Sequence, residues 1–288
     1  MLCPVLPEKH PQTAENGEAM IYHNPVLKGF YPDPSVCCAN GMYYMVCSSF
    51  QYFPGVPLFE SKDLVNWSQI GHVLIRPSQV TLEQVPSSGG VFAPTIRHLN
   101  GRFYMVTTNA STGENFYVYT DDIHGAWSDP VTVAQDGIDP SLYFEAGNAY
   151  FMSNGTDADG VNGVVQCQID LATGEKLSPS RCIWQGSGGR FLESPHLYRI
   201  GDWYYLMAAE GGTEYGHMIT YARSKSLWGP FTGYPHNPVL TNRNKAPYPI
   251  QGIGHGDLVQ DARGIFSVWA SGSRRCGWHS ITWAEKCS

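Results

Sequence analysis

The sequence lacks features that mark several common classes of protein. It has no run of the roughly 18 apolar residues that a membrane-spanning helix needs. Its first twenty residues hold no long apolar stretch of the kind found in signal peptides, so we expect a cytoplasmic protein. No two of its eight cysteines are spaced as Cys-x-x-Cys, which argues against a zinc site.

Charge and helical periodicity are also scarce. Only 15% of the 288 residues are charged and the net charge is −7, which argues against binding to nucleic acid; a membrane partner is not expected either. No segment shows sustained helical spacing, whereas Tyr, Trp, Gly and Pro are frequent, as in a sheet-rich fold with many turns. The sequence therefore predicts an all-β protein, and its oligomeric state cannot be read from the sequence.

A short pattern occurs five times along the chain. In each copy a turn containing Gly is followed by a strand rich in aromatic and β-branched residues, as expected of a hairpin. The copies are GMYYMVCSS from Gly41, GRFYMVTTN from Gly101, GNAYFMSNG from Gly147, GDWYYLMAAE from Gly201 and GIFSVWASG from Gly264. Their spacing predicts five four-stranded units, and hence a five-bladed β-propeller over residues 21–288. Residues 1–20 are expected to be a disordered extension.

Acidic residues recur at one position of this pattern. Counting back eight residues from each Gly gives Asp33, Ala93, Asp139, Glu193 and Gly256, the last flanked by His255 and Asp257. An Asp before Pro commonly just begins a turn, and Asp33 and Asp139 both precede Pro. Three acids in register are costly, because clustered negative charges repel one another. We therefore expect them to converge on the propeller axis, for chemistry or for a cation.

Six segments of the chain resemble glycoside hydrolase family 43, in particular its β-xylosidase and α-L-arabinofuranosidase branch. The resemblance runs from about residue 22 to about residue 270. The segments are NPVLKGFYPDPSV (24–36), SSFQYFPGVPLFESKDLVNW (48–67), FAPTIRH (92–98), IDPSLYFE (138–145), LESPHLYRIGDWYYLMAAEGGTEYGH (192–217) and GIGHGDLV (252–259).

The resemblance implies an inverting glycosidase on a five-bladed propeller. By position, Asp33 matches the family's general base, Glu193 its general acid, and Asp139 a third carboxylate that orients the acid and tunes its pKa. Inversion needs one carboxylate to activate water and one carboxylic acid to protonate the leaving oxygen. We expect the negative charge of Asp139 to contribute to a raised pKa of Glu193.

Further residues are expected to contact the sugar. The resemblance places Phe50, Phe53 and Phe92 at ring contacts to the substrate, although ordinary packing between blades would explain them equally well. Thr213 and His217 follow the hairpin that carries Glu193, and either a substrate contact or a structural role fits them.

His255 lies one residue from the axial position of the fifth repeat. The resemblance implies a residue that lines the pocket or helps to hold a central Ca²⁺ through water, which would suit a cation that prefers oxygen ligands. No other cofactor is expected.

The C-terminus departs from the family pattern. The family's Leu-Gly-Arg-Glu element, whose Arg reaches the pocket, has no counterpart in residues 271–288. We expect the fifth blade to be short of strands, and residues 21–30 are a candidate to supply one. An incomplete blade would leave unpaired strand edges, so we also expect the protein to have low stability and weak activity.

The expected function is removal of terminal β-D-xylose, or secondarily α-L-arabinofuranose, from short xylan-derived oligosaccharides. A small oligosaccharide is then the expected partner. The alternative is a carbohydrate-binding propeller that has lost catalysis, although such a protein would not require an acid–base pair.

Overall fold

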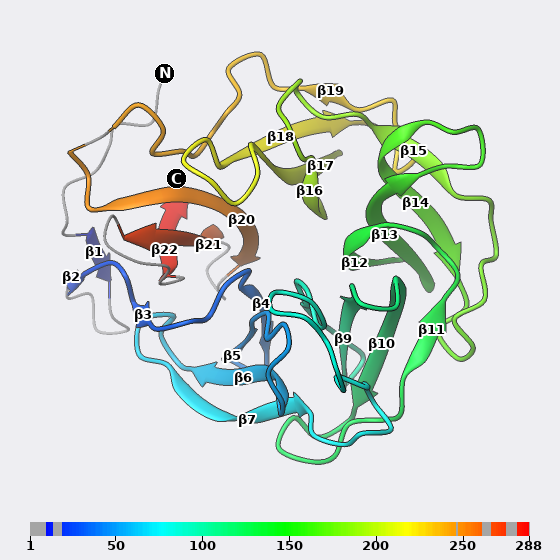
Figure 1. Ribbon diagram of the computed structural model, residues 1–288. Helices are drawn as coiled ribbons and strands as arrows, with labels where there is room; N and C mark the ends of the chain where they lie inside the picture. Colours follow the sequence, from blue (N-terminus) through cyan, green and yellow to red (C-terminus); the bar gives the residue numbers. More distant parts are fainter. Residues whose placement is uncertain (1–9, 14–18, 246, 261–265, 275–280, 288) are drawn as a thin grey trace.

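The computed structural model describes residues 10–13, 19–245, 247–260, 266–274 and 281–287. Every regular element in these residues is a β-strand. Among them no helix is found that could cross a membrane. The strands form four-stranded antiparallel sheets arranged around a common axis, each with its first strand innermost (Figure 1). The fold is therefore an all-β propeller.

The sheets follow one another along the chain. Sheet I has the strands β4 (Ser35–Ala39), β5 (Met42–Val46), β6 (Gly55–Ser61) and β7 (Ser68–Leu74). Sheet II has β8 (Thr95–Leu99), β9 (Arg102–Asn109), β10 (Glu114–Thr120) and β11 (Val131–Val133). Sheet III has β12 (Ile138–Glu145), β13 (Asn148–Thr156), β14 (Asn162–Ile169) and β15 (Arg181–Trp184). Sheet IV has β16 (Glu193–Ile200), β17 (Trp203–Glu210), β18 (Met218–Ser224) and β19 (Thr232–Gly233).

Sheet V combines strands from both ends of the chain. Its order is β20 (Ile250–Gln260), β21 (Phe266–Arg274), β22 (Ile281–Cys287) and β3 (Leu27–Lys28). Ile281 pairs with Lys28, and Thr282 pairs with Leu27. We expected this sheet to be short of strands. In the described residues it has as many strands as its neighbours, because the segment 21–30 supplies β3.

The aromatic strands of the repeat are apolar on both faces because each is packed between two neighbouring sheets. In β9, Phe103 and Met105 belong to a core shared with sheet I, whereas Tyr104 and Val106 belong to a core shared with sheet III. Side chains alternate from one face of a strand to the other. A strand buried on both faces therefore reads as a nearly continuous apolar run, which explains why the repeat was visible in the sequence.

A chain of hydrogen bonds joins the innermost strands of all the sheets close to the axis. Each bond crosses from one sheet to the next and involves buried or half-buried groups. They run from the Ile96 N–H to Ser35 Oγ (3.0 Å), from Thr95 Oγ1 to the Pro140 carbonyl (2.9 Å), from Ser141 Oγ to the Pro195 carbonyl (2.5 Å), from the Leu258 N–H to the Tyr198 hydroxyl (2.9 Å) and from Ser35 Oγ to Asp257 Oδ2 (2.5 Å). The sheets are thus held in register around the axis by polar contacts as well as by apolar packing.

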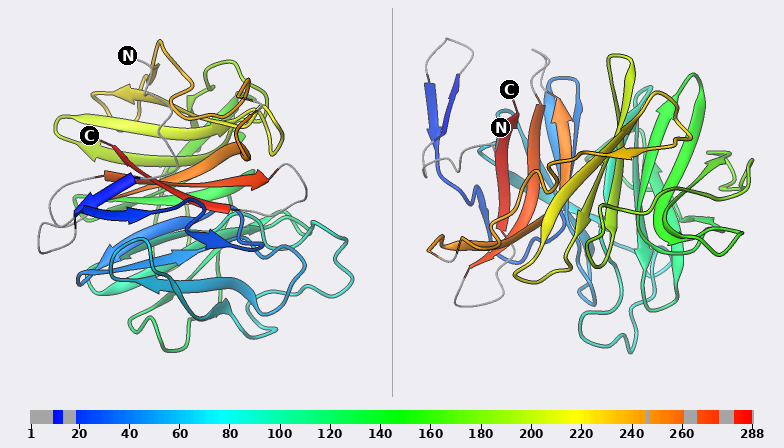
Figure 2. Two further views of the ribbon diagram at one scale, coloured as in Figure 1. Left: turned by 90° about the vertical axis from the view of Figure 1, so that its left-hand side faces the viewer. Right: turned by 90° about the horizontal axis from the view of Figure 1, so that it is seen from above.

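The N-terminal segment adds a small separate sheet. β1 (His10–Thr13) pairs with β2 (Ala19–Tyr22), and this hairpin lies outside the ring of larger sheets (Figure 2). The predicted disordered extension therefore includes a hairpin where it is described. Residues 1–9 and 14–18 lie outside the described residues, so for them the prediction stays a prediction.

Candidate active site

One position in the innermost strands directs side chains to the axis. Ser35, Ser141, His196 and Asp257 hold the same place in their sheets, each pairing with the corresponding residue of the second strand. The residues two positions earlier share a left-handed backbone. They are Asp33 (φ 56°), Asp139 (φ 54°), Ser194 (φ 54°) and His255 (φ 46°). Such a conformation is uncommon outside glycine, so its recurrence marks a local geometry that the fold imposes.

Glu193 reaches the site from the neighbouring position. Counting back from the turn glycines had placed it in register with Asp139, and this was wrong by one residue. Gly147 is the second residue of its hairpin turn, between the paired Glu145 and Asn148, whereas Gly201 is the first residue of its turn. The residue equivalent to Asp139 is therefore Ser194, and Glu193 pairs with Ala209 just before it.

The structure nevertheless brings the predicted acidic residues together. His255 Nδ1 lies 3.6 Å from Asp33 Oδ1 and 3.8 Å from Asp139 Oδ2. Asp33 also accepts a 2.6 Å hydrogen bond from Ser48 Oγ, and Asp139 accepts one of 3.2 Å from the Ser194 N–H. Three residues from sheets I, III and V thus meet at the axis, with Glu193 adjacent to the Ser194 N–H that binds Asp139.

The surroundings of Glu193 favour its protonated form. Burial raises the pKa of its carboxyl to about 7, and the negative charge of Asp33 adds to this rise. For Asp139, burial raises the pKa well above its usual range, with further contributions from Glu193 and Asp33. We had expected Asp139 to raise the pKa of Glu193. Repulsion between two carboxylates is mutual, and Glu193 is among the groups that raise the pKa of Asp139, so the contribution of Asp139 to the pKa of Glu193 stays a prediction.

The surroundings of the two histidines of the site favour their neutral forms. Burial lowers the pKa of His255, although Asp33 and Asp257 oppose the change. The pKa of His217 falls to about 4, through burial and then through repulsion from His255. His217 Nδ1 lies 3.1 Å from the Gly252 carbonyl, so this nitrogen carries the proton and donates it. His217 also packs against Gly254, where a Cβ would come within 2.3 Å of its ring.

Thr213 is less closely tied to the site than His217. It is exposed, and no contact among the described residues joins it to Asp33, Asp139 or His255. Its role in sugar binding stays a prediction.

A directly bound metal does not fit the described residues. No group of three or more His, Cys, Asp and Glu side chains among them could hold a metal ion. Both carboxylates near His255 lie beyond hydrogen-bonding distance of its Nδ1. A Ca²⁺ held through water is the arrangement that stays a prediction.

Aromatic rings gather beside Asp33. Phe50 lies 5.7 Å from Phe92 and 5.8 Å from Phe30, measured between ring centroids. Phe30 and Phe53 are 45% and 48% exposed. The predicted pair Phe50 and Phe92 is therefore in contact, and Phe30 extends the cluster, whereas for Phe53 the structure shows only that about half of its side chain is exposed. Phe30 was not predicted from the sequence, although it lies only three residues before Asp33.

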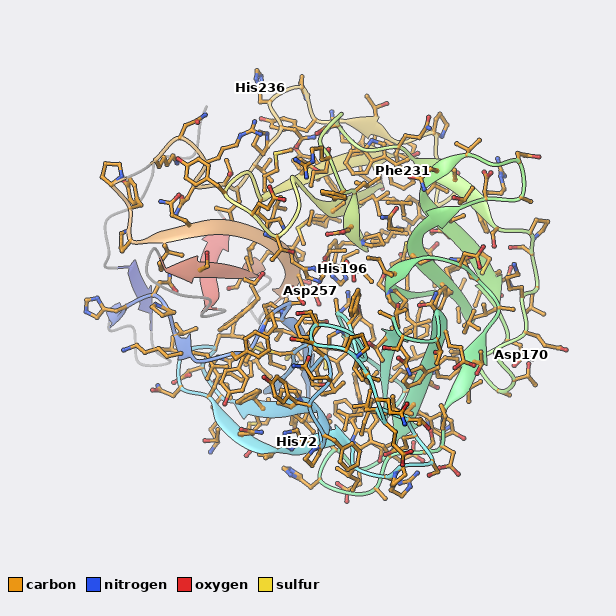
Figure 3. The ribbon with its side chains drawn as sticks, in the orientation of Figure 1. His72, Asp170, His196, Phe231, His236 and Asp257 are labelled. Carbon is orange, nitrogen blue, oxygen red and sulfur yellow. The ribbon has the colours of Figure 1, made fainter. Side chains whose placement is uncertain are left out.

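A buried ion pair beneath the site was also missed. Arg97 donates to both carboxylate oxygens of Asp257, at 2.8 and 3.2 Å, and to His196 Nδ1 at 2.9 Å. Figure 3 shows His196 and Asp257 near the centre of the ring. The Arg97 guanidinium helps to hold the pKa of Asp257 well below its usual range, and burial lowers that of His196 to about 3. The spacing of the sequence does not mark this pair, because its two partners lie in different sheets.

The fold and the site together define a propeller with an acidic centre, and the comparisons with known proteins agree. The model of the glycosyl hydrolases family 43 matches residues 22–287. The chain is 46% identical to a "Xylosidase/arabinosidase" of Butyrivibrio fibrisolvens over 269 residues, which cover 89% of this chain and 52% of that protein. It is 45% identical to the "Non-reducing end alpha-L-arabinofuranosidase BoGH43B" of Bacteroides ovatus over 254 residues, covering 86% of this chain and 47% of that protein.

Solved structures are similar as well. "Bacteroides ovatus Xyloglucan PUL GH43B" superimposes with a TM-score of 0.87 at 41% identity and covers 93% of this chain and 54% of that one. This chain thus spans about half the length of the relatives it matches. The chain belongs to glycosyl hydrolase family 43.

Proposed function

We propose that this protein is an inverting, exo-acting glycosidase that removes terminal β-D-xylose, α-L-arabinofuranose or both from short oligosaccharides. The observation that carries the proposal is that the carboxyl groups of Glu193 and Asp33 lie close enough for the charge of Asp33 to act on Glu193. The pKa of Glu193 is raised to about 7, partly by the negative charge of Asp33. A buried carboxyl whose pKa is raised by a neighbouring carboxylate is suited to act as the general acid of such a pair.

In the proposed reaction Asp33 acts as the general base. It takes a proton from a water molecule, whose oxygen attacks the anomeric carbon of the terminal sugar. Ser48 Oγ donates to Asp33 Oδ2 and thereby orients the carboxylate. The second oxygen faces His255 Nδ1. Attack from the face opposite the leaving group inverts the anomeric configuration.

Glu193 acts as the general acid in this proposal. It gives its proton to the glycosidic oxygen as the bond to the anomeric carbon breaks, so the leaving sugar departs as a neutral alcohol. The reaction is balanced, because water supplies the hydroxyl of one product and, through the two carboxyl groups, the proton of the other. Asp139 is proposed to orient the site through its contacts with the Ser194 N–H and His255.

The substrate class follows from the relatives and from the aromatic cluster. Relatives of this chain are named for xylosidase activity, for arabinofuranosidase activity, or for both. We propose that the apolar face of the sugar packs on Phe50, Phe53 and Phe92, of which Phe50 and Phe92 are in contact and Phe53 is 48% exposed. Two pentoses of similar size are difficult to distinguish by such contacts, so the proposal keeps β-D-xylose, α-L-arabinofuranose or both as substrates.

We further propose that sheet V completes a five-bladed propeller. The pairing of β22 with β3 and the apolar cores on both sides of sheet V support this. A complete ring would give the active site the rigidity that acid–base catalysis needs. The low stability and weak activity expected from a short fifth blade lose their main support.

The test is hydrolysis of aryl β-D-xyloside and aryl α-L-arabinofuranoside by the protein and by its Asp33→Asn and Glu193→Gln variants. We expect both variants to lose at least about 10²-fold in kcat, the lower range for a lost acid or base. Nuclear magnetic resonance of the first-formed sugar should show the inverted anomer. Sugar binding by a folded wild-type protein without hydrolysis would replace this proposal with the carbohydrate-binding alternative.

The water-mediated Ca²⁺ near His255 is tested in the same assay. Exhaustive chelation should lower activity, and added Ca²⁺ should restore it. Full activity after chelation would remove the metal from the proposal.

A further inference from the structure

Glu210 is a buried carboxyl group that takes no part in the proposed reaction. It ends β17, the second strand of sheet IV, and is only 1% exposed. Its Oε1 accepts hydrogen bonds from the Ser187 N–H at 2.9 Å and from Thr220 Oγ1 at 2.7 Å. Its Oε2 accepts one from the Gly189 N–H at 2.5 Å. A buried carboxyl group needs such partners because burial takes its water away. Two of the three donors belong to one loop, so the carboxyl group of Glu210 fixes the course of the chain there.

The loop that Glu210 holds leads directly into Glu193. It is rich in glycine, and Gly186 and Gly188 have positive φ values of 84° and 102°. Glycine has the widest backbone freedom of all residues, so such a segment has little tendency to keep one conformation by itself. At Gly189 a Cβ would lie 2.6 Å from Glu210 Oε2, so the close approach of the two requires glycine. The conformation of the loop therefore depends on its contacts with Glu210.

Three consecutive residues, 209–211, hold the segment that ends in the proposed acid. Ala209 pairs with Glu193 in the sheet, and the Gly211 N–H donates to the Arg190 carbonyl at 2.6 Å. Glu210 lies between them in the sequence and accepts from the two N–H groups further upstream. Every residue from 187 to 193 is therefore itself in contact with residues 209–211 or adjacent to a residue that is. A change at Glu210 would displace the segment that carries Glu193.

We propose that Glu210 is a positioning residue, which fixes the segment 187–190 and thereby holds Glu193 in the place from which it protonates the leaving group. The inference rests on the proposed glycosidase function, because that function makes Glu193 the general acid. A general acid must lie within hydrogen-bonding distance of the atom that it protonates, and a displacement of about 1 Å can cost roughly 10²-fold in rate. In this role Glu210 acts through the backbone and does not contact the sugar.

The experiment varies how much the leaving group needs a proton. A dinitrophenyl pentoside releases a stabilised phenolate and needs little help from an acid, whereas an unsubstituted phenyl pentoside needs the proton. In Glu210→Gln the side chain keeps its size, but whichever oxygen is replaced, the new NH2 group faces a backbone N–H. We expect kcat on the phenyl pentoside to fall by about 10- to 100-fold, and kcat on the dinitrophenyl pentoside to change little.

Gly189→Ala disturbs the same contact from the side of the loop. The residue is exposed, and its φ lies outside the left-handed region, so its backbone conformation is open to alanine. The added Cβ would displace the Glu210 carboxyl group, which lies 2.6 Å from it. We expect the same selective loss of kcat on the phenyl pentoside. This variant also decides the question if Glu210→Gln does not fold.

Asp157→Asn is the matched control. Asp157 follows the second strand of sheet III and also binds backbone N–H groups, those of Asp159, Val161 and Cys182, at 3.0, 2.9 and 2.9 Å. None of these partners lies in the segment that carries Glu193. Its replacement should lower Tm and leave the ratio of kcat on the two pentosides unchanged.

The ratio separates a positioning role from a structural one. Equal losses on the two pentosides in Glu210→Gln, or no loss on either, would overturn the inference and leave the proposed function in place. If the wild-type protein hydrolyses neither pentoside, the proposed function and the role of Glu210 fail together. The assay is run well below the Tm of each variant, so that a loss of folded protein does not enter the comparison.

Discussion

Replacing Glu193, the proposed general acid, with a neutral residue should stabilise the protein at neutral and alkaline pH but not at acidic pH. Glu193 has its pKa raised from 4.5 to about 7, chiefly by burial. The folded state therefore holds a proton between these pH values that the unfolded state has released. By linkage, stability falls as pH rises from about 4.5 to about 7 and then stays reduced.

The magnitude follows from the shift in pKa. Each pKa unit corresponds to about 1.4 kcal/mol, so ionised Glu193 costs the folded protein about 3 kcal/mol above pH 7. Glu193→Gln removes the ionisation and keeps the shape of the side chain. At pH 8 the variant should be more stable than wild type by up to about 3 kcal/mol, or roughly 6–10 °C in Tm. At pH 4.5 the difference should vanish.

The assay is urea denaturation and thermal melting of both proteins from pH 4.5 to 8. Glu175→Gln is the control, because Glu175 is exposed and its replacement should leave stability unchanged throughout. A gain in Glu193→Gln that does not depend on pH would mean that packing and not charge causes it. No gain at pH 8 would refute the argument that burial and Asp33 hold this carboxyl in its protonated form.

Three further predictions concern neighbouring groups. Asp139→Asn should move the fall of kcat/KM with rising pH to lower pH, because it removes a buried carboxyl that repels Glu193; an unchanged midpoint in the pH–rate profile would contradict this. Asp257→Asn should cost about 3–5 kcal/mol in urea denaturation, because it leaves the buried Arg97 charge without its partner, and a cost below about 1 kcal/mol would show that the pair is dispensable. Phe53→Ala should raise KM about fivefold, the effect of about 1 kcal/mol of lost apolar contact, and change Tm little because the ring is 48% exposed; a fall in Tm with unchanged KM would assign Phe53 to packing.

The sequence predicted the fold because its repeat reflects a physical requirement. Strands packed between two sheets are apolar on both faces, and the hairpins that join them need residues that tolerate a positive φ, as at Asn40 and Gly41. Five such hairpins were therefore countable. The part supplied by β3 was harder to predict, since a two-residue strand has no periodicity of its own and pairs with a segment at the other end of the chain.

The sequence predicted which acidic residues form the site better than it predicted how they are arranged. Asp33 and Asp139 follow from the register of the repeat. Glu193 lies one residue before the position equivalent to Asp139. The count of eight residues reached it only because Gly201 is the first residue of its turn, whereas Gly147 is the second. Arg97 was missed for a different reason. Its partner, Asp257, lies in another sheet, and a contact between such distant residues leaves no mark in the spacing of either segment.

The pairing of β3 with β22 sets the order of events during synthesis. β3 is among the first strands to leave the ribosome, and β22 is the last of the described strands to do so. Sheets I to IV can form as the chain grows, but the pairing of Leu27 and Lys28 with Thr282 and Ile281 must await release of the C-terminal segment. Until then β3 presents an unpaired edge, and a premature stop before β22 would leave a nascent chain prone to self-association.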